Sequence, residues 1–134
     1  MRNFEIAVVG IVEHKGNILI GKKQNKEHFL SGGWHIPGGK INKEENYKKA
    51  LKRELLEETG CRVKILKQLD EKLDSVHRMI VKWYLCTPIT FKLKAGDDLK
   101  EIKFVPKERV LKICDARAIA VWPPKVINFF QNKN

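Results

Sequence analysis

Three glutamates near the middle of the chain are spaced so that they could share one chemical task. Glu54, Glu57 and Glu58 are three and four residues apart, or adjacent, and on a helix such residues lie on one side. Like charges this close repel each other, which favours a cation among them. Carboxylate oxygens suit Mg²⁺ or Mn²⁺, and Mg²⁺ usually completes its ligand set with water and substrate phosphates. The cluster therefore indicates phosphoryl chemistry, and the alternative is a solvated helix face rich in Glu and Lys.

The residues around this cluster form a longer pattern. Gly39 is followed after five residues by Glu45 and after seven more by Arg53, and the run ends in Gly60 and Cys61. This arrangement resembles the signature of the Nudix hydrolases at every fixed position except the last, where the family usually has an aliphatic residue and this chain has Cys61. A pattern of about nine fixed positions is far more specific than a lone glycine motif.

The resemblance implies a metal site built from oxygen atoms. The expected metal is Mg²⁺, with Mn²⁺ as a substitute, and the expected ligands are the Gly38 carbonyl and the carboxylates of Glu54, Glu57, Glu58 and Glu101. Roughly two or three such ions would bridge the substrate phosphates, neutralise developing charge and lower the pKa of a bound water.

The resemblance also implies three catalytic residues, Arg53, Glu54 and Glu57. Arg53 is expected to orient the glutamate that takes a proton from the attacking water, and Glu54 is favoured as that general base. Some family members use a carboxylate from a later loop instead, and the corresponding alternatives here are Asp97, Asp98 and Glu101.

Further residues are candidates for contact with the substrate. Lys22 and Lys23 end the strand expected at 18–23, and Gly39 and Lys40 belong to the glycine turn. Arg78 is expected on the strand at 76–87, and Trp122 could stack on a base. The alternative is that Lys22, Lys23 and Arg78 are solvated surface residues and that Trp122 is a packing anchor.

The expected reaction is hydrolysis of a diphosphate bond in a nucleoside diphosphate linked to another group. The short chain, the PGGK turn at 37–40 and the WPP segment at 122–124 favour the small MutT-like members, which convert a nucleoside triphosphate to monophosphate and pyrophosphate. The alternatives are an ADP-ribose or nucleotide-sugar pyrophosphatase, an RNA 5′-end pyrophosphohydrolase, and a non-catalytic nucleotide- or RNA-binding module. A non-catalytic member should have lost a carboxylate of the motif, and all of them are present here.

Periodicity predicts that the motif lies on a helix from about Asn42 to Thr59. Asn42 is the expected N-cap, Glu45 would complete a capping box, and Gly60 is expected to end the helix. The apolar face of this helix is expected to be formed by Tyr47, Ala50, Leu51 and Leu55.

Strands are expected before and after the helix. In the N-terminal half, residues 5–13 and 18–23 should form a hairpin. A polar loop with Phe29 and Leu30 is expected at 24–33 and a short strand at 34–36. In the C-terminal half, residues 61–73 and 76–87 should form an antiparallel strand pair, followed by a loop at 87–98 and a third strand at 99–106. A short helix is expected at 107–112 and a helix interrupted by Pro123 and Pro124 at 116–130. The resemblance implies an α/β (α+β) fold, a Nudix-type α/β/α sandwich with a mixed sheet between helices, and residues 1–134 are expected to form one domain.

Composition adds limits on partners and location. The net charge of +11, from 27 basic and 16 acidic residues, would attract polyanions such as nucleotides and RNA, although a lysine-rich surface without a nucleic-acid partner is the alternative. The three cysteines are expected to be buried and to form neither a disulfide framework nor a zinc site. No membrane span or secretory leader is expected, which favours a cytoplasmic protein. Family members are often homodimers, and the sequence does not test this.

Overall fold

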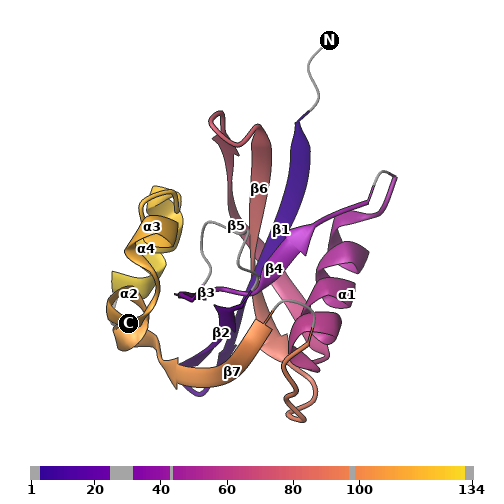
Figure 1. The fold of residues 1–134 in the computed structure, drawn as a ribbon. Helices are drawn as coiled ribbons and strands as arrows, with labels where there is room; N and C mark the ends of the chain where they lie inside the picture. The colour runs from indigo at the N-terminus through magenta and orange to yellow at the C-terminus, as the bar shows by residue number, and fades with distance from the viewer. Residues whose placement is uncertain (1–3, 25–31, 43, 97–98, 132–134) are drawn as a thin grey trace.

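The computed structural model describes residues 4–24, 32–42, 44–96 and 99–131. Its strands are β1 (Glu5–His14), β2 (Asn17–Lys23), β3 (Trp34–His35), β4 (Gly38–Lys40), β5 (Val63–Asp74), β6 (Met79–Pro88) and β7 (Leu99–Pro106) (Figure 1). Its helices are α1 (Tyr47–Thr59), the 3-10 turn η1 (Lys107–Arg109), α2 (Val110–Ile113), α3 (Ala116–Ile119) and α4 (Pro124–Gln131). The predicted order of strands and helices is confirmed except at 38–40, where the expected glycine turn is the short strand β4, paired with β1. The loop expected at 24–33, with Phe29 and Leu30, lies largely outside the described residues.

The strands form one mixed sheet of seven strands. The order is β3-β2-β1-β6-β5, with β4 paired to β1 and β7 paired to β2. Strands β1 and β6 run parallel, whereas the predicted β1–β2 hairpin and the predicted β5–β6 pair are antiparallel. Strand β2 pairs with β7 along its whole length, with β1 only beside their turn, and with β3 only at Gly21 and Lys22.

Helix α1 covers one face of this sheet. Its buried residues Ala50, Leu51 and Leu55 pack against residues of β1, β2 and β6. Gly10 of β1 permits this close approach, since a Cβ there would come 2.7 Å from a methyl carbon of Leu55. The catalytic-motif helix is therefore fixed to the sheet by its apolar side.

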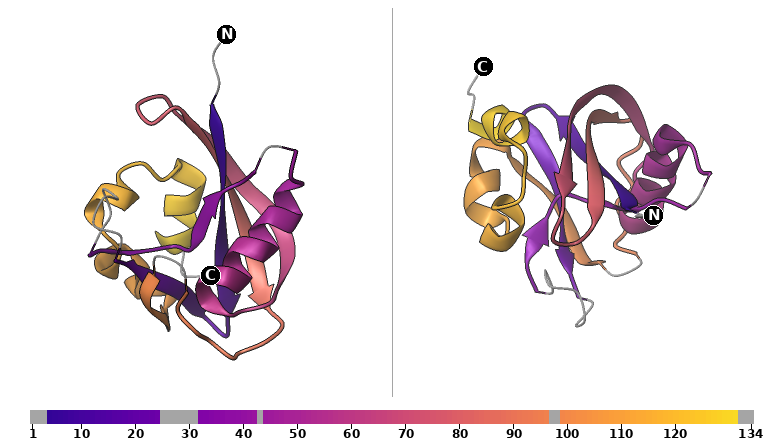
Figure 2. Two further views of the ribbon diagram at one scale, coloured as in Figure 1. Left: turned by 45° about the vertical axis from the view of Figure 1, so that its right-hand side comes forward. Right: turned by 90° about the horizontal axis from the view of Figure 1, so that it is seen from above.

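The C-terminal helices cover the opposite face. Helices α2 to α4 and the residues between them contribute the buried residues Val110, Cys114, Ala118, Trp122, Val126 and Phe130, which pack against β1, β2 and β6. The sheet thus lies between two helical layers, as the sequence predicts (Figure 2). None of the described helices has the length and apolar character that crossing a membrane requires.

The start of α1 differs from the prediction. Its N-cap is Asn46, whose side chain accepts hydrogen bonds from the backbone N–H groups of Lys48 and Lys49. A helix cannot run from Asn42 because Glu44 has a φ of +69°, in the left-handed region. Glu45 does accept the backbone N–H of Asn42, at 3.1 Å, but this bond closes a separate turn before the helix.

Tyr47 is also placed differently from the prediction. It is 39% exposed, and its ring lies 4.7 Å from the Lys82 ammonium instead of in the core. As the first residue of α1, Tyr47 lies at the rim of the interface between helix and sheet. The other three residues of the predicted apolar face, Ala50, Leu51 and Leu55, are fully buried.

Two other features agree closely with the sequence. Gly60 ends α1 with a φ of +75°, as predicted for a helix C-terminus. The cysteines Cys61, Cys86 and Cys114 are buried and free, and burial raises the pKa of the Cys86 and Cys114 thiols to about 12. These thiols are therefore part of the packing and are not reactive groups.

Two adjacent leucines of α1 provide a test of this packing. Leu55→Ala is expected to lower the free energy of unfolding by about 2–5 kcal/mol because it leaves a cavity under the helix. Leu56→Ala removes the same atoms from a side chain that is 39% exposed, and it should cost clearly less. Urea denaturation followed by circular dichroism measures both values, and equal losses would contradict the packing described for α1.

Candidate active site

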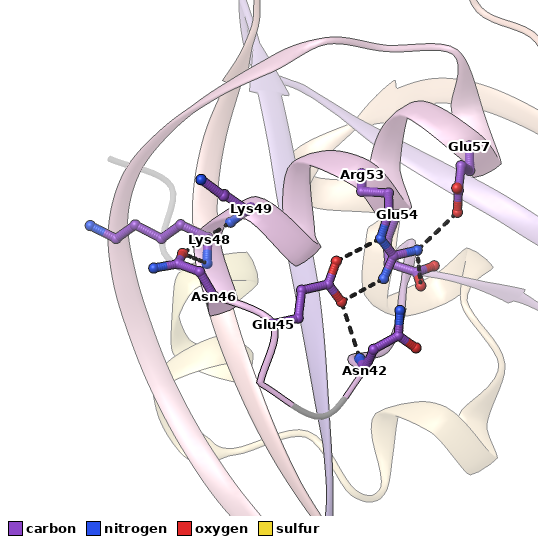
Figure 3. A network of polar contacts seen from close by, with 8 residues as sticks. All are labelled: Asn42, Glu45, Asn46, Lys48, Lys49, Arg53, Glu54 and Glu57. Carbon is purple, nitrogen blue, oxygen red and sulfur yellow. Dashed lines mark hydrogen bonds and ion pairs between the residues drawn. The ribbon is translucent and has the colours of Figure 1, made fainter.

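Arg53 is the centre of a polar network on the exposed side of α1 (Figure 3). Its Nε and Nη2 donate to the two carboxylate oxygens of Glu45, each at 2.8 Å. Its Nη1 donates to Glu54 at 3.1 Å and to Glu57 at 3.0 Å. One guanidinium therefore holds three carboxylates.

The charge of Arg53 affects the titration of its partners. The hydrogen bonds from Arg53 lower the pKa of Glu45 to about 2, with a further contribution from the Asn42 backbone. The same pairing raises the pKa of Arg53. Both groups are thus charged throughout the pH range in which hydrolysis of a phosphate compound would be measured.

The sequence marks Glu45 as a fixed position of the motif but gives it only a capping role. The structure shows that Glu45 binds Arg53 in a two-point ion pair, eight residues along the chain. Its place in the motif, at a constant distance from Arg53, was the signal that could have revealed this function.

The two glycines before α1 lie against the glutamates of the helix. The Gly38 N–H donates to Glu58 at 3.0 Å, and a Cβ on Gly39 would come 2.5 Å from Glu54. Gly38 lies opposite Val9 in the sheet, and a side chain there would collide with the Val8 carbonyl. Glycine is required at position 38 because a Cβ would collide with the backbone of β1, whereas a Cβ at position 39 would displace the Glu54 carboxylate.

The three clustered glutamates therefore have different surroundings. Glu58 is only 3% exposed and faces β4, whereas Glu54 and Glu57 are held by Arg53. Among the described residues, no three His, Cys, Asp or Glu side chains are already arranged as a metal cage. Mg²⁺ commonly takes one or two carboxylates and completes its shell with water and phosphate, so this set of hard oxygen donors fits such an ion.

Glu101 lies on β7 and is not among the hydrogen-bond partners of Arg53 described above. It is opposite Lys22 of β2, which in turn is opposite Trp34 of β3. Asp97 and Asp98 lie outside the described residues, but the chain just before them is tied to the end of α1. The N–H of Gly96 donates to the Glu58 carbonyl at 2.9 Å, and that of Lys94 donates to the Thr59 carbonyl at 2.8 Å.

The remaining sequence-predicted residues are dispersed. Lys23 is buried at the end of β2, Lys40 forms an exposed ion pair with Glu5 at 3.0 Å, and Arg78 lies in the β5–β6 turn over the Phe4 ring. Of the six candidates for substrate contact, Gly39 is the one placed directly against Glu54.

Trp122 lines a cavity of about 130 Å³ between the sheet and α3. Its ring meets that of Trp83 edge to face, with centroids 5.4 Å apart. Ile36, Ala118 and Val81 add apolar wall, and His35, Lys72 and Asp74 are the polar or charged lining residues. Sequence reasoning places Trp83 on the strand at 76–87 but does not predict a role in a cavity, because its contact with Trp122 is long-range.

A larger groove of about 760 Å³ is lined by residues 4–6, 41–42 and 44–47. It reaches Glu45, whose carboxylate faces Arg53. The smaller cavity reaches Ile36, which precedes Pro37 and the Gly38–Gly39 pair. Ile36, on the wall of the smaller cavity, is therefore two residues before Gly38 and three before Gly39, the residues that lie against Glu58 and Glu54.

Comparisons with known proteins agree with this geometry. The model of the NUDIX domain family matches residues 1–126, so the chain belongs to this family. It is 33% identical over 107 residues to an 8-oxo-dGTP diphosphatase of Buchnera aphidicola, a match that covers 72% of this chain and 82% of that protein. It is 32% identical over 112 residues to an ADP-ribose pyrophosphatase of Methanocaldococcus jannaschii, covering 81% of this chain and 65% of that protein.

The fold is shared with a solved Nudix hydrolase from Nitrosomonas europaea. The TM-score is 0.84 at 16% identity, over 99% of this chain and 73% of the other. Family membership makes the chain a hydrolase of phosphoric anhydride bonds, in a family whose members generally use divalent metals.

Glu57 provides a test of the site. Glu57→Gln keeps the side-chain volume and removes the charge, so metal-dependent turnover should fall at least about tenfold while the unfolding midpoint stays unchanged. Glu108→Gln, the same change at an exposed residue of η1, is the matched control and should retain full activity. Wild-type turnover in Glu57→Gln would exclude Glu57 as a metal ligand or catalytic residue.

Proposed function

We propose that this chain hydrolyses a nucleoside triphosphate to the monophosphate and pyrophosphate with Mg²⁺ as the metal. The observation that carries the proposal is the position of the cavity at Trp83 and Trp122. Ile36 on its wall is two residues before Gly38, and Gly38 and Gly39 contact Glu58 and Glu54. A base in the cavity would leave its phosphates close to the carboxylates.

The cavity suits a nucleobase in character. Two indole rings and aliphatic side chains form most of its wall, which favours a flat aromatic ligand. Lys72, Asp74 and His35 supply polar groups that can orient the base. Trp122 thus has a role in packing and, in this proposal, a role in base binding as well.

The residues of α1 and β4 would perform the chemistry. Glu54, Glu57 and Glu58, with the Gly38 carbonyl and Glu101, would hold Mg²⁺, which when bound neutralises phosphate charge and activates water. Glu54 accepts a proton as the water oxygen bonds to phosphorus and the bridging P–O bond breaks. Arg53 keeps Glu54 oriented by the 3.1 Å hydrogen bond. Asp97, Asp98 and Glu101 are the alternative bases, and Lys94 and Gly96, which precede the two aspartates, are hydrogen-bonded to the end of α1.

The relatives support a nucleotide substrate of two kinds. The name of the Buchnera protein favours a purine nucleoside triphosphate, including an oxidised one, and this fits the reaction proposed here. The name of the Methanocaldococcus protein makes ADP-ribose the second candidate. Both substrates contain the diphosphate linkage that the site would cleave.

A substrate panel tests the proposal. Nucleoside triphosphates, oxidised deoxynucleoside triphosphates, ADP-ribose, nucleotide sugars and 5′-triphosphorylated RNA are compared by kcat/KM with Mg²⁺ and Mn²⁺. The best substrate should be a triphosphate that yields pyrophosphate, and ¹⁸O from labelled water should appear in a phosphate product. A higher kcat/KM for ADP-ribose than for every triphosphate would overturn the proposed triphosphate substrate but would still agree with hydrolysis of a diphosphate bond. Products without ¹⁸O in a phosphate group would exclude attack of water at phosphorus.

The cavity is tested by a change at Ala118. Ala118→Leu narrows the cavity and should raise KM for the best triphosphate about tenfold, with a smaller change in kcat. Ala116→Leu adds the same atoms at an exposed position of the same helix and should leave KM unchanged. Thermal unfolding checks that both variants are folded, and equal KM values in the two would place the base outside this cavity.

A further inference from the structure

The positive charge of the chain is concentrated at one end of the molecule. Four segments meet there: the β1–β2 turn at 14–17, the start of β5 at 62–64, the loop at 89–94 and η1 at 107–109 (Figure 1). The Lys107 N–H donates to the Gly16 carbonyl at 2.9 Å, the His14 and Phe91 rings are 4.6 Å apart, and the Ile89 N–H donates to the Arg62 carbonyl at 2.6 Å. These contacts make the four segments one continuous surface, called here the basic strip.

The basic strip carries seven cations and one acid, a net charge of +6 out of the +11 of the whole chain. The acid is Glu108, and the cations are Lys15, Arg62, Lys64, Lys92, Lys94, Lys107 and Arg109. All of these cations except the half-buried Lys107 are exposed. The Lys107 ammonium lies 3.9 Å from the centroid of the Phe129 ring. The ion pairs of the described residues do not involve the other six cations, which can meet an external anion.

An aromatic ring lies among these cations. Phe91 is 54% exposed and belongs to neither of the two hydrophobic clusters. Its ring rests against His14 with an interplanar angle of 57°, so it is supported from one side. An exposed ring that packing does not require is a platform on which a base can stack.

We infer that the basic strip binds single-stranded nucleic acid. The lysines and arginines contact backbone phosphates, and a base stacks on Phe91, the combination by which non-sequence-specific single-strand binding works. The strip differs from a membrane-binding surface because its charges are carried by turns, a strand end and a loop, and not by an amphipathic helix. The hydrogen bonds of Arg53 go to Glu45, Glu54 and Glu57, none of which belongs to the strip, so RNA binding can be tested independently of hydrolysis.

The inference is tested with a fluorescein-labelled single-stranded RNA of about 12 nucleotides. A 5′-hydroxyl end and EDTA in the buffer keep the probe from acting as a substrate. The strip variant combines Lys15→Gln, Arg62→Gln and Lys92→Gln. The matched control combines Lys49→Gln, Lys67→Gln and Lys125→Gln, three exposed lysines on α1, β5 and α4, and has the same net charge.

Fluorescence anisotropy at several salt concentrations gives the affinity and its salt dependence. The strip variant should bind the RNA at least about tenfold more weakly, and the slope of log affinity against log salt should fall by about 2, the value for three lost phosphate contacts on a single strand. Phe91→Leu should weaken binding about tenfold with an unchanged slope. The control variant should bind like the wild type, and all variants should hydrolyse the best nucleotide substrate normally.

Three results would overturn the inference. They are equal loss of RNA binding in the strip variant and the control, wild-type RNA binding in the strip variant, and loss only of binding to phosphatidylserine vesicles in the strip variant. The last result would assign the strip to an anionic membrane. None of them bears on the proposed hydrolysis, because the probe has no phosphoric anhydride bond.

Discussion

The candidate site depends on the guanidinium of Arg53. Four carboxylates lie within one short stretch of chain, and their mutual repulsion would spread Glu54 and Glu57 into solvent if no cation were present. Arginine stays charged at any pH at which the protein is folded, and its fork of N–H groups binds several oxygens at once. Because Nε and Nη2 of Arg53 both donate to Glu45, the remaining nitrogen, Nη1, is directed at Glu54 and Glu57. An isolated exposed ion pair contributes little, but a network fixes positions.

The glycine pair gives this network its connection to the rest of the molecule. Gly38 and Gly39 form most of β4, which pairs with β1 and follows Ile36, a residue packed on the face covered by α3 and α4. Ile36 is buried on that face, and two residues later the backbone meets Glu58 of α1 on the opposite face. A ligand could therefore extend from an apolar cavity to a group of carboxylates within a few residues of chain. Because Gly38 and Gly39 have no Cβ atoms, β4 can lie close to both the β1 backbone and the Glu54 carboxylate.

Local signals and long-range contacts explain what the sequence could predict. The stop of α1 at Gly60 and the buried face at Ala50, Leu51 and Leu55 depend on neighbouring residues, and these predictions are confirmed. Strand β6 is present, but its burial does not alternate as predicted because helices cover both faces of the sheet, so Trp83 and Tyr84 are both buried. The start of α1 was wrong because Asn42 and Asn46 are equally good N-caps by type, and the left-handed φ of Glu44 decides between them.

The contacts that shape the site are long-range. Trp83 and Trp122 are 39 residues apart in the chain, and Glu58 and Gly38 are 20 apart. Hydrophobic periodicity along the chain does not predict such long-range contacts.

The parallel pairing of β1 with β6, from Glu5 with Met79 to Val12 with Cys86, has a consequence for synthesis of the chain. During translation β1 emerges long before β6, so an apolar strand that ends up in the middle of the sheet has an open edge while the chain grows. The hairpin with β2 and the pairing with β4 offer early partners, which would limit aggregation of the nascent chain until β6 arrives.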